Sequence, residues 1–228
     1  MSALLHVFDG SYEARRAAAL SGVPLSTVYD WARKDVVVPS VSRVRQKLWS
    51  YADLMALRVV YWLRHPKEDD AGEVAASPMA EVRRVLQRLD AEGLDIWSQA
   101  GQDASASPLV VDRNGRIFVR GLDGVQDSTG QLVLDEDVLD LLGVFQAEGG
   151  GGPDLIRPRP HLRIVPGKLS GEPHVERTRI ATSSIAALHR RGYPAELIAE
   201  LYPDVDATAI AEAIALEGQL ADNLSAAA

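Results

Sequence analysis

The sequence predicts a helix-rich α+β protein, and three observations lead to this fold class. Residues 13–34 have the pattern of two short helices joined by a tight turn, and a hairpin pattern with a basic tip follows them. Between Leu94 and Val133 the apolar residues change from helical spacing to short β-type runs. Three helical segments follow Thr182 in close succession. We therefore expect a winged helix-turn-helix head, a mixed α/β middle and a trihelical C-terminal domain, at residues 1–66, 77–146 and 154–224.

The head begins with two predicted helices hinged at Ser21–Pro24. The small residues Ala17–Ala19 allow the second helix to approach the first closely. In the second helix Leu25, Val28 and Trp31 recur at helical spacing, which predicts that they form its inner face and that Trp31 anchors the core.

The outer face of the second helix carries hydroxyl groups, an aromatic ring and cations. These are the groups that reach phosphates and base edges in a major groove. Beyond it, residues 36–49 place β-branched and aromatic runs on either side of a basic tip, which predicts a hairpin wing. A solvated basic face is the alternative interpretation, but the position on a second helix and a wing favours DNA contact. The expected DNA-binding residues are Ser26, Thr27, Tyr29, Arg33, Lys34, Arg43, Arg45 and Lys47.

Two longer helices are predicted after the wing. Ser50 and Asp53 have the spacing of a capping box, and the helix that they open is expected to keep Arg58 on its outside. Residues 67–77 are polar and acidic, which predicts a loop. A second helix is expected over residues 78–92, with proline at its first position.

The middle region is expected to contain strands. Leu109–Val111 and Ile117–Val119 flank a turn sequence and predict a hairpin, and a further strand is expected near Leu94. Residues 138–145 predict a short helix with carboxylates in its first turn. The glycines at 149–152 are expected to form a flexible linker, and they mark a domain boundary.

The C-terminal domain is predicted to contain one short strand, Leu162–Val165, and three helices at 183–191, 194–202 and 206–224. Its expected core consists of Ile185, Leu188, Leu197, Ile198, Leu201, Ile210, Ile214 and Leu216.

Charge is unevenly distributed along this chain, whose formal net charge is −8. Residues 1–64 carry nine basic and five acidic side chains, residues 65–152 carry seven and seventeen, and residues 153–228 carry eight and ten. In the last part all the cations precede residue 192, and seven carboxylates follow it. DNA affinity depends on local cation density, so a basic head can work on an acidic protein. The acidic remainder can face a basic partner.

Several other functions are disfavoured. The 228 residues include no cysteine, no apolar run long enough to span a membrane and no secretory signal, so we expect a cytoplasmic protein without membrane contact. The five histidines are scattered singly, and the carboxylates of Asp135–Asp137 suit a helix N-terminus better than a metal. No nucleophile–base pair is recognisable. We therefore expect no catalytic residue, no metal and no cofactor.

The head resembles the winged helix-turn-helix of MerR-like regulators over residues 11–64. The matching features are Ala17, Ala19, Gly22-Val23, Val28, Trp31 and the segment Trp49–Leu54. Asp35 stands where that family often has glycine, and the long dimerisation helix of its ligand-sensing members has no counterpart. The resemblance implies a DNA-binding head.

Residues 161–220 are similar to a small bacterial domain that occurs in antitoxins and that was for a long time described only as a domain of unknown function. The counterparts of its pattern are Gly171, Pro173, Thr178-Arg179-Ile180, Gly192-Tyr193, Ile198 and Tyr202-Pro203, with Arg177 in place of a usual glycine. In this order the two modules resemble a VapB-type antitoxin. That resemblance implies a homodimer, or a larger hetero-oligomer with its toxin, that binds a PIN-domain ribonuclease toxin and represses its own operon on double-stranded operator DNA.

PIN nucleases bind metal through carboxylates, and an arginine of an antitoxin can neutralise such a site. The candidate toxin-binding residues are Arg157, Arg159, Arg163, Arg177 and Arg179. For Arg179 we favour a structural role instead, as a hydrogen-bond donor within its own turn. Two other functions stay open. One is a MerR-like regulator that senses a small ligand through residues 78–146 without a toxin partner, and the other is a hydrolase built on the same region.

Overall fold

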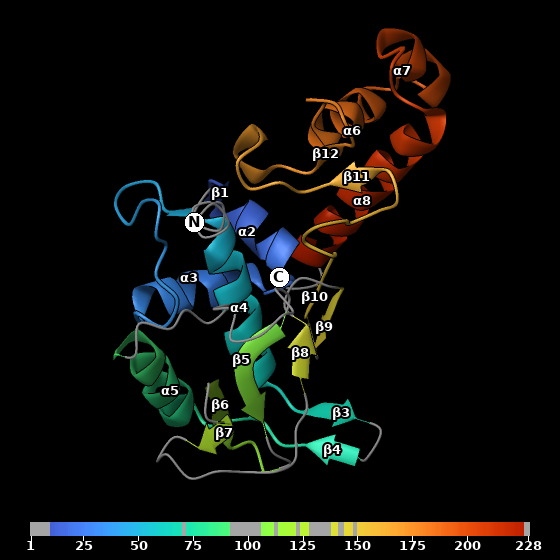
Figure 1. Ribbon diagram of the computed structural model, residues 1–228. Helices are drawn as coiled ribbons and strands as arrows, with labels where there is room; N and C mark the ends of the chain where they lie inside the picture. The colour runs from blue at the N-terminus through green and yellow to red at the C-terminus, as the bar shows by residue number, and fades with distance from the viewer. Residues whose placement is uncertain are drawn as a thin grey trace.

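The computed structural model describes residues 10–69, 72–91, 106–111, 114–121, 124–127, 138–140, 144–147 and 150–225. These residues form a mixed α+β fold that is rich in helices, as the sequence predicts. Figure 1 shows the N-terminal helices at the centre, a small sheet below them and the C-terminal helices extending to the upper right.

The two predicted helices of the head are confirmed as α2 (Ala14–Ser21) and α3 (Leu25–Arg33). Gly22 ends α2 at a φ of 75°, and its N–H donates to the carbonyl oxygen of Ala18. Glycine adopts this left-handed conformation without steric cost, which explains its place in the hinge. Val28 and Trp31 are buried on the inner face of α3, as their spacing predicts.

The prediction that residues 36–49 form a two-stranded hairpin wing is wrong. Within residues 34–50, all of which are described, the only strand is β2 (Leu48–Trp49), and it pairs antiparallel with β1 (Tyr12–Glu13). The preceding loop is closed by one bridge, in which the backbones of Ser42 and Leu48 exchange hydrogen bonds of 2.9 and 3.2 Å. The β-branched run that suggested the other strand is largely buried after α3, so its apolar side chains serve the core.

Helix α4 (Tyr51–Arg64) begins with the predicted capping box. The Asp53 N–H donates to Ser50 Oγ at 3.2 Å, and the Ser50 N–H donates to Asp53 Oδ2 at 2.8 Å. Ser40 joins this cap, because its N–H and its hydroxyl both donate to Asp53 Oδ2 at 2.8 Å. The cap therefore also fixes the start of the loop that leads to β2.

Arg58 was expected on the outside of α4, and this expectation is wrong because α4 is buried on almost all sides. The side chain of Arg58 is fully buried, and its Nη2 donates to the carbonyl oxygens of Leu20 and Pro153 at 2.8 and 2.5 Å. Its guanidinium group also lies 5.5 Å from the ring centroid of Phe145. Backbone carbonyls thus accept two of the hydrogen bonds that a buried cation requires.

The middle region contains the four-stranded sheet β7-β6-β5-β8, in which all neighbours are antiparallel. Its strands are β5 (Ala106–Val111), β6 (Ile117–Gly121), β7 (Gly124–Asp127) and β8 (Val138–Asp140). The predicted pairing of Leu109–Val111 with Ile117–Val119 is confirmed, and Leu109 lies opposite Val119. Helix α5 (Met79–Ala91) is confirmed as well.

Two other expectations for the middle region are wrong. The predicted loop after α4 contains the hairpin of β3 (Lys67–Asp69) and β4 (Gly72–Val74). The helix predicted from residue 138 is replaced by β8, because a short apolar run fits a strand as well as a helix and β5 supplies a pairing edge. The strand expected near Leu94 and the carboxylates of Asp135–Asp137 lie outside the described residues.

The glycine run is a packed strand rather than a flexible linker. β10 (Gly150–Gly152) pairs antiparallel with β9 (Phe145–Ala147). A Cβ atom on Gly152 would lie 2.7 Å from the carbonyl oxygen of Leu20, and one on Gly150 would collide with the carbonyl oxygen of Gly22. The close approach of two backbones, rather than a need for flexibility, accounts for glycine here.

The three C-terminal helices are confirmed as α6 (Thr182–Arg190), α7 (Ala195–Leu201) and α8 (Ala207–Ser225). Before them lie β11 (Leu162–Arg163), the short 3₁₀ helix η1 (Leu169–Gly171) and β12 (His174–Val175), and β11 pairs with β12. The strand expected from Leu162 is thus shorter than predicted. Leu197 and Leu201 were expected in the core, but they are 38% and 52% exposed.

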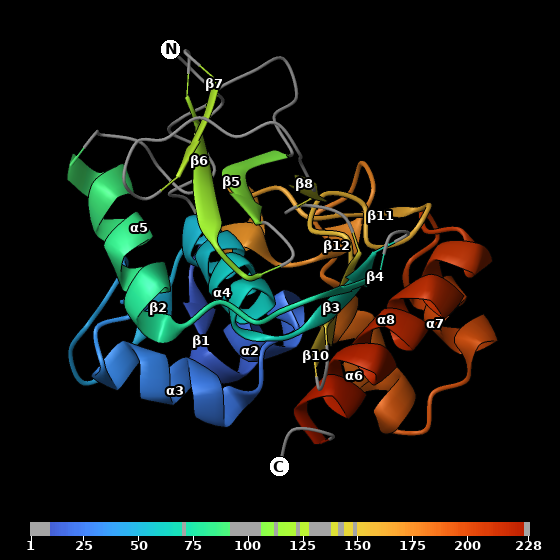
Figure 2. The same cartoon turned by 90° about the horizontal axis from the view of Figure 1, so that it is seen from below.

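The tail packs directly on the head, where α8 lies against α2 (Figures 1 and 2). The Tyr12 hydroxyl donates to the carbonyl oxygen of Gly171 at 2.8 Å. Asn223 Nδ2 donates to the carbonyl oxygen of Gly151 at 2.6 Å, and the Tyr51 hydroxyl donates to that of Leu155 at 2.8 Å. Separate hydrogen bonds therefore join the tail to the head and to the glycine strand.

Candidate nucleic-acid interface

The outer face of α3 presents the polar residues that the sequence analysis selected. Ser26, Arg33 and Lys34 are exposed, Tyr29 is 48% exposed and Thr27 is half-buried. The ring of Tyr29 also meets Trp49 of β2 edge-on, with 6.5 Å between ring centroids. That contact fixes the direction of α3 relative to the strand that follows the basic loop.

Asp30 modifies the charge of this face. Its carboxylate pairs with Arg33 Nη2 at 2.6 Å and with Lys34 Nζ at 2.8 Å. The hydrogen bond from Lys34, with a further one from Arg33, holds the pKa of Asp30 below its usual value. The two cations of α3 are thus held along the helix surface by one carboxylate, and a phosphate would compete with Asp30 for them.

The basic loop, residues 36–47, carries the other expected DNA-binding residues. Arg43 and Arg45 are exposed and have no hydrogen bond or ion pair with any described residue, whereas Lys47 is half-buried. Gln46 ties the tip to β1, because its Nε2 donates to Glu13 Oε1 at 2.8 Å. In Figure 1 this loop projects from the left side of the molecule, on the side where α3 lies.

A hollow of about 570 Å³ beside α3 brings in residues that the sequence analysis missed. Thr27 of α3 and Lys34, just after that helix, line it together with Arg64 of α4 and Arg83 of α5. Arg83 is exposed and donates to the carbonyl oxygen of Lys34 at 3.3 Å. In the predicted helix at 78–92 the apolar pattern leaves the arginines on the outside, and this could have drawn attention to Arg83. Only the fold shows that α5 lies close enough to α3 for Arg83 to contact Lys34.

Three of the five predicted toxin-binding arginines have partners within the tail. Arg157 donates to the carbonyl oxygen of Pro160 at 3.0 and 3.2 Å. Arg159 donates to Gln219 Oε1 at 2.6 Å, and Arg163 pairs with Glu176 at 2.9 Å. These guanidinium groups hold the approach to the tail helices in place, so a partner would have to displace those contacts.

Arg177 and Arg179 differ, because both are exposed and neither has a hydrogen bond or ion pair with a described residue. The structural role favoured for Arg179 is wrong. Thr178 holds the turn instead, since its hydroxyl donates to the carbonyl oxygen of Val175 at 2.9 Å and accepts from the Ile180 N–H at 3.1 Å. Arg177 has a φ of 63°, which explains why glycine suits this position.

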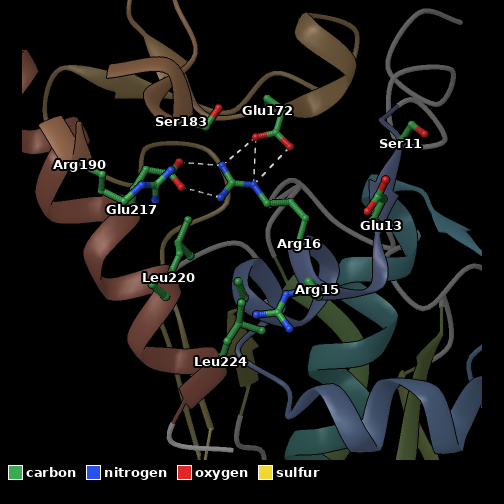
Figure 3. A pocket seen from close by; sticks show the side chains of 12 residues that line it. Ser11, Glu13, Arg15, Arg16, Glu172, Ser183, Arg190, Glu217, Leu220 and Leu224 are labelled. Carbon is green, nitrogen blue, oxygen red and sulfur yellow. Dashed lines mark hydrogen bonds and ion pairs between the residues drawn. The ribbon is translucent and has the colours of Figure 1, made fainter. Parts of the chain in front are cut away.

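An ion-pair network joins head and tail at a site that the sequence analysis did not identify (Figure 3). Arg16 of α2 donates from both terminal nitrogens to Glu217 of α8 at 2.8 Å, and from Nε to Glu172 at 2.9 and 3.2 Å. The Thr182 hydroxyl donates to Glu217 at 2.5 Å. Burial raises the pKa of Glu217, but the hydrogen bonds and charge of Arg16, the Thr182 hydroxyl and the charge of Arg190 together leave this pKa below the usual value.

A cavity of about 510 Å³ lies over this network. Its apolar wall includes Leu220 and Leu224 of α8, and its rim includes Arg15 of α2 and Arg190 of α6. Neither Arg15 nor Arg190 has a hydrogen bond or ion pair with a described residue. The cavity therefore offers apolar contact and cations together.

The described residues contain no group of three or more histidine, cysteine or carboxylate side chains placed to hold a metal ion. No helix among them has both the length and the apolar character that crossing a membrane requires.

The comparisons with known proteins concern the tail. A family described as "Protein of unknown function (DUF433)" matches residues 163–216, which run from β11 into α8. Comparisons with curated proteins and with solved structures gave no match. The family match agrees with the resemblance noted over residues 161–220 and does not extend to the head.

Proposed function

We propose that this protein is an antitoxin of a type II toxin–antitoxin pair that binds operator DNA, represses its own operon and neutralises a PIN-domain ribonuclease. In this proposal the head contacts a duplex through α3 and the basic loop, and the protein acts stoichiometrically in the cytoplasm, without catalysis.

One observation carries the DNA-binding part: α3 and the basic loop present exposed cations on the same side of the head. Arg33 and Lys34 are exposed at the end of α3, and Arg43 and Arg45 are exposed in the basic loop. Figure 1 shows this loop on the side of the molecule where α3 lies. An exposed helix presenting hydroxyls and cations fits the width of a major groove, and a basic loop beside it can reach the phosphate backbone. Arg83 adds a further cation beside Lys34.

The toxin-binding part of the proposal rests on the resemblance of the tail to an antitoxin domain. The internal contacts of the five candidate arginines favour two of them as toxin-binding residues. Arg177 and Arg179 are exposed without partners among the described residues, and they support a role in contacting carboxylates of a nuclease. Arg157, Arg159 and Arg163 stay candidates only if the toxin displaces their internal contacts.

The DNA contact is tested by fluorescence anisotropy with a labelled duplex from the region upstream of the gene, over a series of salt concentrations. Arg33→Ala combined with Arg45→Ala is expected to weaken binding and to lower the slope of log K against log salt by about 2, because about one counterion is released per phosphate contact. Arg177→Ala combined with Arg179→Ala is the matched control and should leave the slope unchanged. Unchanged binding in the first variant would refute the assignment.

The toxin contact is tested by co-expression with the product of the adjacent reading frame. The wild-type chain should co-purify with that product and suppress its ribonuclease activity, and Arg177→Ala combined with Arg179→Ala should suppress it less. Failure to co-purify would refute the antitoxin function and would leave the DNA measurement standing.

A regulator that senses a small ligand is the second candidate. It is favoured by the 510 Å³ cavity between α2 and α8, rather than by residues 78–146 as the sequence analysis suggested. A ligand there would touch the helix that precedes α3. Thermal unfolding with a panel of amphipathic carboxylates tests this function, and no rise in the melting temperature would count against it.

A further inference from the structure

Helix α7 has an apolar face that the described part of the fold leaves uncovered. Leu197 and Leu201 are four residues apart, so they lie on the same side of the helix, and they are 38% and 52% exposed. Tyr193, just before the helix, is 39% exposed. The inner side of α7 is a different one, because Ile198 is fully buried. The exposed leucines are therefore not needed to attach α7 to α6 and α8.

A row of carboxylates borders this apolar face. Glu196 immediately precedes Leu197, and Glu200 immediately precedes Leu201. Asp204 lies three residues after the end of α7. All three are exposed, and none has an ion pair with a described residue. Residues 192–228 contain no lysine or arginine. The nearest cations along the chain are Arg190, which lines the cavity on the α2 side, and Arg191 at the end of α6.

The position of α7 separates this face from the candidate DNA interface. In both Figure 1 and Figure 2, α7 lies at the end of the molecule remote from α3 and α5. A duplex against α3 would leave α7 accessible to a second macromolecule.

We propose that the face formed by Tyr193, Leu197, Leu201, Glu196, Glu200 and Asp204 is a protein-docking surface. Its occupant is a partner protein with an apolar helix face flanked by lysine or arginine. An exposed apolar patch rimmed by charges marks a protein interaction site, and complementary charge at the rim directs the partner.

The charge of this face argues against two other occupants. DNA would meet a row of carboxylates and be repelled. A second copy paired about a two-fold axis would bring the same patch against itself, with carboxylates facing carboxylates. This inference goes beyond the proposed function, because it identifies a partner surface whose carboxylates do not suit the acidic centre of a PIN nuclease.

The surface is tested with the full-length chain and a fluorescein-labelled helical peptide that has leucines on one face and lysines on both flanks. The wild-type chain is expected to bind this peptide, with an affinity that falls as salt rises. Leu197→Ser combined with Leu201→Ser should weaken binding at least tenfold. Glu196→Gln combined with Glu200→Gln should weaken it and remove most of the salt dependence. A peptide with glutamate in place of lysine should not bind.

The control variant is Ile156→Ser combined with Val165→Ser, which changes two apolar side chains of similar exposure, 49% and 43%, outside α7. It should bind as the wild type does, and circular dichroism should show that each variant keeps its helix content. Equal binding of the lysine and glutamate peptides, or full binding by the Leu197/Leu201 variant, would overturn the proposal. So would a wild-type dimer that this variant converts to monomer in sedimentation, since the occupant would then be a second copy.

Operator binding is measured on the same variants. If the wild-type chain binds the peptide but not the operator, the proposed function is refuted and the α7 surface stands. The reverse result would overturn the α7 surface alone.

Discussion

The ion-pair network of Arg16 leads to the most quantitative prediction, the effect of Arg16→Met. This substitution keeps much of the volume of the side chain and removes all of its contacts to Glu217 and Glu172. The side chains of Arg16, Glu217 and Glu172 are 18%, 8% and 28% exposed. Removing one partner of a buried ion pair costs about 3–5 kcal/mol, because the other charge stays buried without compensation. Since Arg16 and Glu172 keep some water contact, we expect a loss near the lower end, about 3 kcal/mol.

The loss should depend on pH, and its direction follows from the pKa of Glu217. In the folded wild type this pKa lies below the usual value, so the stability from the pair is present above the unfolded pKa of about 4.3 and is lost as pH falls through the folded value. In Arg16→Met the burial of Glu217 is no longer compensated, so its folded pKa should lie above the unfolded one. Protonation then stabilises the variant, and the gap to wild type narrows from about pH 7 to about pH 4.

Urea unfolding followed by tryptophan fluorescence at both pH values measures this gap. The control is Arg15→Met, in which the neighbouring, exposed arginine is replaced and the change should stay within about 0.5 kcal/mol. A cost of less than about 1 kcal/mol for Arg16→Met near neutral pH, or the same cost at both pH values, would contradict a stabilising buried ion pair at Arg16.

The remaining predictions concern backbone geometry. Gly152→Ala should destabilise the protein by about 3 kcal/mol in urea unfolding because its Cβ would lie 2.7 Å from a carbonyl oxygen, whereas Gly218→Ala, in α8 with no atom within 4 Å of the new Cβ, should stabilise it by about 1 kcal/mol. Equal effects of these two substitutions would show that the glycine strand is not tightly packed. Asp35 and Arg177 have φ angles of 52° and 63°, so Asp35→Gly and Arg177→Gly should each raise stability in thermal unfolding by about 1 kcal/mol. Alanine at either position should bring no such gain, and equal stability of the glycine and alanine variants would contradict this account.

The sequence predicts local structure well where one short-range rule governs it. Gly22 ends α2, Ser50 and Asp53 begin α4, and the apolar spacing of α3 gives its buried face correctly. These features depend on residues only a few positions apart. The exposed face of α3 follows from the same spacing, so the candidate DNA-binding residues of that helix could be selected before the fold was known.

The errors occur where distant parts of the chain determine the outcome. The glycine run looks like a linker until Gly22 is seen against it, and Arg58 looks like a surface cation until α4 is seen to be enclosed. Leu197 and Leu201 have core-like spacing, but α7 contacts the rest of the tail through Ile198. Arg83 joins the candidate interface only because α5 folds back beside α3.

The attachment of α8 to the head has a consequence for how the tail can be studied. The family match ends at residue 216, yet the helix continues to Ser225, and the side chains that join it to α2 and β10 come after the match: Glu217, Leu220 and Asn223. A fragment that contains only the matched residues would lose these contacts and would expose apolar side chains of α8 that the head covers in the whole chain. Its tendency to aggregate in solution would then reflect the cut, and not the behaviour of the same residues in the whole chain.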